Sequence, residues 1–262
     1  MKSRSGDVKR AVDVVLTVLL LFLMAFQVTG DAVHEWLGIA MTAVLVLHHI
    51  LNRKWYKSVF KGKYTAYRAV MTAVNTLMLA AIVLTALSGM AMSGHAVPFM
   101  YGIINVMTAR SLHLGMSHWS FILMGVHIGL HLKAMTAKLS DRGRAVFIWI
   151  LTAAAGAGLW FISKSEILGY ITFRTHFAFM DFSAAKWAVL LKNLAMLLFF
   201  VLMGYIISEV TQKNKEGRHS AKALVFLLCA AAVCLVLNIC VKEDDAYGGT
   251  TAWSAGAVCV DK

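Results

Sequence analysis

Proline, acidic residues and charge are all scarce in this chain. Its 262 residues include one proline, and 13 Asp and Glu stand against 25 Lys and Arg. Charged residues make up 15% of the chain and hydrophobic residues 60%. One proline excludes a proline-rich chain, and the high hydrophobicity excludes intrinsic disorder, which requires the opposite. A soluble domain carries much more charge, so the composition predicts a membrane protein.

The formal net charge of +12 fits two kinds of protein. Proteins that bind nucleic acid are basic, but membrane proteins also hold surplus Lys and Arg in their cytoplasmic loops. Because the composition already favours a bilayer, we attribute the charge to membrane insertion and expect no nucleic-acid partner.

The four cysteines form no C-x-x-C pair and no C-x-x-C-H sequence. A zinc ribbon and a covalently attached c-type haem therefore lack their ligands. Any haem would have to be held by non-covalent ligation.

Seven apolar runs are long enough to cross a bilayer, since about 20 helical residues at about 1.5 Å each span the hydrocarbon core. We therefore expect an all-α fold, a polytopic membrane helix bundle of about seven transmembrane helices. The first run follows a basic N-terminus, as in a signal peptide, but no small-x-small cleavage site follows it, so we interpret it as a retained helix. The predicted spans are residues 11–29, 34–51, 70–92, 113–132, 145–163, 187–208 and 222–241.

Lys and Arg are concentrated in every second segment outside the predicted spans. The N-terminus and the segments 53–68, 133–144 and 213–222 hold 18 of the 25 Lys and Arg. Because cytoplasmic loops contain the excess, we expect a cytoplasmic N-terminus and a C-terminal tail outside. There Cys240 and Cys259 either form a disulfide, which an oxidising compartment allows, or remain free thiols.

Histidines recur at matched spacing in two of the spans. His34 and His48 are 14 residues apart, and so are His113 and His127. Fourteen helical residues advance about 21 Å and return to within about 40° of the same face. The predicted orientation makes the two spans parallel, so His34 would lie level with His113 near the outside and His48 level with His127 near the inside.

Two facing imidazoles are the ligands that six-coordinate haem iron needs. We therefore predict two haems b, an outer one on His34 and His113 and an inner one on His48 and His127. The alternative is that these histidines only form hydrogen bonds with neighbouring helices. His49 is the rival to His48, and His131 is a secondary candidate near the inner surface.

Glycines near the histidines have two interpretations. They could let a flat macrocycle approach the backbone, or they could allow close packing of helices. The glycines concerned are Gly38, Gly115, Gly125 and Gly129.

Several stretches around these histidines resemble the flavinylation-associated cytochrome family of prokaryotic membrane proteins, which are cytochrome b-like dihaem proteins. The resemblance extends to about residue 211. The stretches are residues 34–38 (HEWLG), 47–57 (LHHILNRKWYK), 61–65 (KGKYT), 109–113 (ARSLH), 125–131 (GVHIGLH) and 175–182 (THFAFMDF).

This resemblance implies a place in the prokaryotic cell (inner) membrane and electron transfer to a flavin-carrying protein outside. In such partners Gly-Ala followed by Ser or Thr accepts the flavin. Here Val258 follows Gly256 and Ala257, so we expect no covalent flavin on this chain.

We accordingly expect three parts. Residues 1–135 form a four-helix haem-binding membrane core, 136–211 form two further membrane helices with an outer aromatic segment, and 212–262 form the last membrane helix and outer tail.

The expected function is transfer of electrons across the membrane, from quinol or another donor to an extracytosolic flavoprotein or other acceptor. The alternative is a histidine-based proton or metal-ion transporter without haem, although the two histidine spans lack an intramembrane carboxylate beside the histidines. A third interpretation is a quinol-dependent oxidoreductase component with a quinone site in residues 170–187, which include Arg174, His176 and Asp181. An interfacial aromatic belt also explains that segment.

Overall fold

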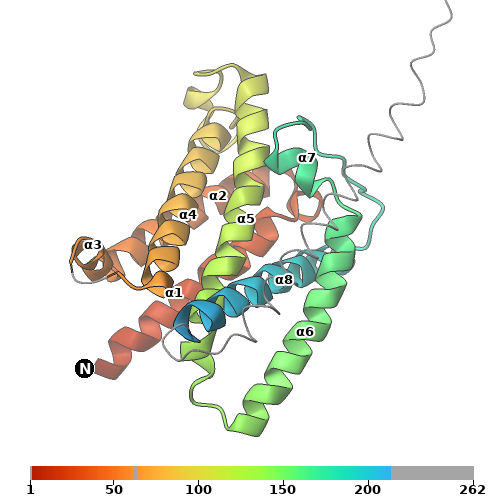
Figure 1. Cartoon of the computed structure of the whole chain (residues 1–262). Coiled ribbons are helices and arrows are strands. Elements are labelled where there is room, and N and C mark those ends of the chain that lie inside the picture. The colour runs from red at the N-terminus through yellow and green to blue at the C-terminus, as the bar shows by residue number, and fades with distance from the viewer. Residues whose placement is uncertain (1, 62–63, 214–262) are drawn as a thin grey trace, which may run out of the picture. The chain divides into compact units, whose positions relative to one another are not determined.

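The computed structural model describes residues 2–61 and 64–213 of the chain (Figure 1). These residues belong to one compact unit, Met1–Lys215, and they contain no β-strand. The predicted seventh span, the C-terminal tail, Cys240 and Cys259 lie outside the described residues. Six long helices are present in the described ranges: α1 (Lys2–Leu23), α2 (Phe26–Leu51), α4 (Ala66–Met90), α5 (Val106–Thr136), α6 (Asp141–Ser163) and α8 (Lys186–Lys213).

Three short elements connect these helices. The helix α3 (Lys54–Val59) precedes α4, the 3-10 turn η1 (Pro98–Met100) lies between α4 and α5, and α7 (Ile167–Ile171) follows α6. The expected all-α fold is confirmed for the described residues. Each of the six long helices overlaps one of the first six predicted spans, but the span predicted over residues 11–29 runs past the end of α1 into the start of α2.

Four of the long helices are apolar enough, and long enough, to cross a membrane: α2, α4, α6 and α8. They indicate a membrane protein that can contact lipid. The other two, α1 and α5, are not among these candidate spans. Charged residues in the first half of α1 and four histidines in α5 lower their apolar character, so the structure supports four spans where the sequence predicted six in this part of the chain.

Side-chain caps determine where three of the helices begin. Thr65 accepts a hydrogen bond from a backbone N–H of α4, Asn105 accepts two from α5, and Ser140 accepts one from α6. Such caps satisfy backbone donors that have no partner within the helix. They place the starts of these helices several residues before the predicted apolar spans.

The helix α2 is kinked at Gly30, whose φ of 71° lies in the left-handed region. Glycine adopts this region without the steric penalty of a Cβ atom. The kink separates the first turn of α2, which follows α1 almost directly, from the straight segment that carries His34 and His48.

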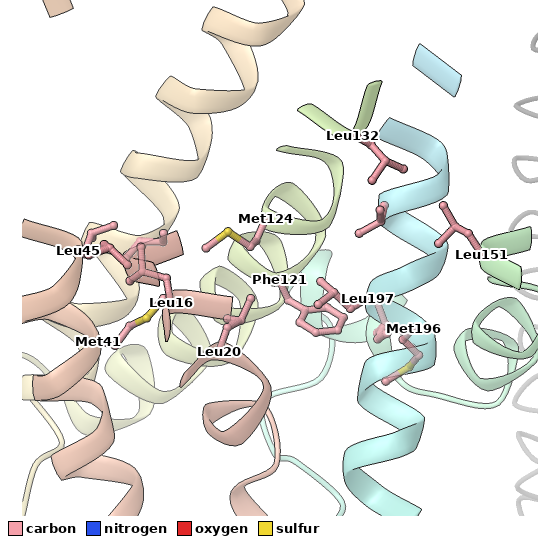
Figure 2. Packing of buried hydrophobic residues seen from close by; sticks show 14 residues of the cluster. Leu16, Leu20, Met41, Leu45, Phe121, Met124, Leu132, Leu151, Met196 and Leu197 are labelled. Atoms are coloured by element: carbon pink, nitrogen blue, oxygen red, sulfur yellow. The ribbon is translucent and has the colours of Figure 1, made fainter. Parts of the chain in front are cut away.

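The helix α5 is the centre of the packing. It lies between α4 and α8 (Figure 1), while α6 packs on α8 and α1 packs on α2. The buried cluster combines leucine and methionine side chains of α1 and α2 with side chains of α5 and α8 (Figure 2). Its labelled members include Leu16, Leu20, Met41, Leu45, Phe121, Met124, Met196 and Leu197.

Glycines make the closest helix contacts. A Cβ atom on Gly129 would collide with the carbonyl oxygen of Val201 in α8, and one on Gly125 would collide with Phe200. One on Gly115 would collide with the ring of Phe173. These three glycines therefore serve close packing, and the interpretation that they make room for a haem is not the one the structure supports.

The predicted basic segments of the described residues gather at one end of the helices. Three side-chain contacts connect the N-terminal segment, the α2–α4 connection and the α5–α6 connection to that end. They are Lys9 Nζ to Asn52 Oδ1 (3.1 Å), Tyr67 hydroxyl to the Leu130 carbonyl oxygen (3.0 Å) and Lys133 Nζ to Glu209 Oε1 (3.2 Å).

Two glycines of α6 test the packing. A Cβ on Gly158 would collide with the backbone of Ala195 in α8, whereas a Cβ on Gly156 would meet nothing within 4 Å. We expect Gly158→Ala to lower the stability by about 1–3 kcal/mol, because the overpacked helices must separate. Gly156→Ala should raise it by up to about 1 kcal/mol through helix propensity. Thermal unfolding in detergent measures both, and equal shifts would contradict the packing.

Candidate functional site

Two of the predicted ligands face one another. The ring centroids of His34 in α2 and His113 in α5 are 6.0 Å apart, and the ring planes are inclined by 71°. The two helix backbones do not pack closely on one another, so the imidazoles approach across an interhelical gap. A Cβ on Gly38, one turn after His34, would meet nothing within 4 Å.

The His113 ring is held in place by α4. Its Nδ1 lies 2.9 Å from the carbonyl oxygen of Thr85, and its ring lies directly against Gly89. An N–H at Nδ1 can donate to that oxygen, which leaves Nε2 free to accept a proton or a metal. Gly89 is a residue that the sequence analysis missed.

The His34 ring has an unsatisfied nitrogen. Its Nδ1 is buried and has no hydrogen-bond partner among the described residues. The Phe26 ring packs edge-on against it, with the centroids 5.1 Å apart. Buried polar atoms are almost always paired in folded proteins, so this nitrogen indicates an incomplete site.

The inner histidines are anchored in the same way. His48 Nδ1 lies 2.8 Å from Asp13 Oδ1 of α1, and His127 Nδ1 lies 2.8 Å from Asn75 Oδ1 of α4. The structure thus places the His34 and His113 rings close together, and it gives His48 and His127 a polar partner each. No ring contact joins His48 to His127 among the described residues.

The carboxylate beside His48 corrects one expectation. The two histidine helices carry no inner carboxylate of their own, but α1 supplies Asp13. Asp13 lies in a different span from His48, and the sequence does not show which helices are neighbours. The amide of Asn52 also lies beside this ring, with its Nδ2 3.4 Å from His48 Nε2.

The secondary candidates occupy different positions. His49 Nδ1 lies 2.7 Å from the hydroxyl of Tyr56 in α3, on a side of α2 different from that of His48. The His131 ring stacks edge-on against His127, with the centroids 4.8 Å apart.

The other described histidines lie elsewhere. His118 Nδ1 bonds to the carbonyl oxygen of Leu114, and its ring lies 4.6 Å from that of Tyr170. His176 bonds to the Ser111 hydroxyl. The His118 ring therefore lies beside Tyr170.

A carboxylate clamp lies beside the outer pair. Glu35 accepts hydrogen bonds from the Ser93 hydroxyl (2.7 Å) and from the backbone N–H groups of residues 94–96 (3.1, 2.8 and 2.8 Å). The clamp ties α2 at His34 to the loop that follows α4. The sequence alone could not identify the partners of Glu35, because backbone donors leave no sequence signal.

The polar residues of the aromatic segment between α7 and α8 bond to different partners. His176 bonds to Ser111 of α5, while Asp181 accepts bonds from the hydroxyl and the backbone N–H of Ser183. These bonds hold the pKa of Asp181 below its ordinary value. Phe179 and Phe182 are 80% and 71% exposed, as rings of an interfacial belt would be.

The distance between the outer rings matches that of two imidazoles bound to one metal ion. Two metal–nitrogen bonds of about 2 Å each, plus the ring radii, separate two opposed imidazole centroids by about 6 Å. Metal-binding histidines usually have the other nitrogen anchored by a carboxylate or carbonyl oxygen. Thr85, Asn75 and Asp13 supply such oxygens to His113, His127 and His48.

Comparisons with known proteins give no assignment. No protein-family model, curated protein or solved structure matches the chain. Among the residues that the structure describes, no three His, Cys, Asp or Glu side chains are grouped to hold a metal ion. A haem iron, by contrast, would take only two side-chain ligands from the protein.

The clamp yields a prediction. Glu35→Gln keeps the side-chain size but turns one acceptor oxygen into a donor that faces backbone N–H groups. We expect a loss of about 1–3 kcal/mol in stability, measured by thermal unfolding in detergent. Asp31→Asn, an exposed change one turn earlier on α2, is the control and should stay within about 0.5 kcal/mol. If Glu35→Gln unfolds at the same temperature as the wild type, the stabilising role of the clamp is refuted.

Proposed function

We propose that the chain is a transmembrane b-type cytochrome with two haems, which carries electrons across the membrane. His34 and His113 would hold the outer haem, and His48 and His127 the inner one. The observation that carries the proposal is the opposed outer pair, 6.0 Å between centroids, in which His113 is anchored through Nδ1.

The anchoring oxygens give this chain's residues a defined task. When bound, haem iron supplies one-electron redox chemistry. Thr85, Asn75 and Asp13 would hold the rings of His113, His127 and His48 in a fixed rotation and tautomer. A histidine held in this way would move less when the iron it binds changes its oxidation state.

The neighbouring histidines support this choice of inner ligands. Tyr56 holds His49 toward α3, whereas Asp13 holds His48 on the side of α2 that meets α1. We therefore assign the inner site to His48 in preference to His49. His131 would act as a polar neighbour of His127.

We infer that the basic end of the helices is cytoplasmic and the end with the Glu35 clamp is outside. Cytoplasmic enrichment of Lys and Arg supports this orientation, and so does the collection of three basic segments at one end. The resemblance to the flavinylation-associated cytochromes supports a prokaryotic cell membrane and an extracytosolic flavin-carrying acceptor. Quinol is the proposed donor, since the described residues hold no nucleotide-binding domain.

A proton or metal-ion transporter is the second candidate. The observation that favours it is the Asp13–His48 pair at 2.8 Å, because proton relays combine carboxylates with histidines. Only the cytochrome proposal requires a strong Soret absorption band that depends on His34 and His113.

The two sites can be tested separately. We expect His34→Ala to remove about one haem per chain, and His127→Ala to remove the other, because each leaves an iron with one axial ligand. Haem content measured from absorbance, relative to protein, checks both variants. The exposed His176→Ala is the matched control and should retain the full content. Unchanged haem content in His34→Ala and His127→Ala would refute the assignment.

A further inference from the structure

A polar cavity lies between three helices at the basic end of the described residues. Its volume is about 300 Å³, and it opens among the last turns of α5 and α8 and the first turn of α6. Its lining consists of Lys133, Thr136, Arg144, Tyr205 and Glu209. None of these side chains belongs to the histidine sites.

Two cations of the cavity retain free hydrogen-bond donors. Lys133 pairs with Glu209 at 3.2 Å, and Arg144 pairs with Asp141 of its own helix. An ammonium group has three donors and a guanidinium group has five. Each cation can therefore bind a second anion without giving up its present partner. Phosphate oxygens are the acceptors that such donors bind most strongly.

The third charge of the cavity restricts the ligand. Glu209 contributes a carboxylate, and its side chain is only 20% exposed. It would repel a doubly charged phosphate but attract an ammonium group. Two cations and one anion therefore complement a phosphodiester that also carries an amine.

The cavity lies near helix ends, which is where lipid headgroups meet helices that cross a bilayer. Lys133 lies three residues before the end of α5, and Arg144 lies three residues after the start of α6. At about 1.5 Å per residue, both are within about 5 Å of a helix end. The headgroup layer extends about 5–7 Å beyond the hydrocarbon core on each side, and basic pockets between membrane helices at the cytoplasmic side bind lipid headgroups.

We propose that this cavity is a binding site for the phosphoethanolamine headgroup of a phospholipid. Lys133 and Arg144 bind the phosphodiester, and Glu209 binds the ammonium group. The apolar ring of Tyr205 packs against the buried cluster and forms the wall beside the glycerol. This site does not depend on the haems.

Native mass spectrometry of the delipidated full chain tests the site by titration with phosphatidylethanolamine. We expect saturable binding of one lipid, weakened about tenfold or more in Arg144→Gln, because a charge-assisted hydrogen bond is lost. This variant leaves the Lys133–Glu209 pair intact, so its thermal stability should match the wild type. Arg142→Gln, an exposed change on the same turn outside the cavity, is the matched control and should bind as the wild type does.

Two further arms identify the ligand. Phosphatidylglycerol, which has the phosphodiester without the amine, should bind about tenfold more weakly, and inorganic phosphate at millimolar concentration should not displace the lipid. Equal binding by the Arg144→Gln and Arg142→Gln variants would overturn the site. Displacement by inorganic phosphate would overturn the lipid assignment, and equal affinity for phosphatidylglycerol would overturn the role of Glu209.

Discussion

The two opposite faces of α5 determine most of this architecture. Gly115 and Gly129 each follow a histidine by two residues, a rotation of about 200° on a helix. One face therefore packs Gly129 against the backbone of α8 and Gly115 against Phe173. The other face directs His113 and His127 toward α4 and α2. Tight packing on the glycine face holds the imidazole face in register.

The histidine face is in turn fixed by polar groups of two neighbouring helices. The Thr85 carbonyl oxygen and the Asn75 amide belong to α4, and Asp13 belongs to α1. The Glu35 clamp attaches α2 to the loop after α4. Because these short hydrogen bonds come from α4 and α1, the rings cannot turn independently of the bundle. Such pre-orientation is what a ligand set for a metal requires.

The sequence predicted the helices and the pairing of the outer histidines from elementary geometry. Apolar runs gave the six long helices of the described residues, and the 14-residue spacing placed His34 beside His113. The same geometry could have corrected the glycines, since a residue two positions from a ligand points away from it. Of the four glycines near the histidines, only Gly38, four residues after His34, lies beside open space.

The sequence could not identify the hydrogen-bond partners that other helices supply to the histidines. Asp13 and Asn75 stand out as single polar residues in apolar runs, which marks them as functional candidates, but nothing in the sequence pairs them with particular histidines. The Glu35 clamp uses backbone N–H groups, which every sequence has. The Lys133 cavity also depends on where the ends of α5 and α8 meet the start of α6.

The most direct test of the account is the haem content of the full chain purified from a native membrane. Two haems b per chain are expected, with the absorption and electron paramagnetic resonance spectra of low-spin iron that has two imidazole ligands. A purified, folded chain with no Soret band would contradict the central claim, and the opposed histidines would then have to serve another chemistry.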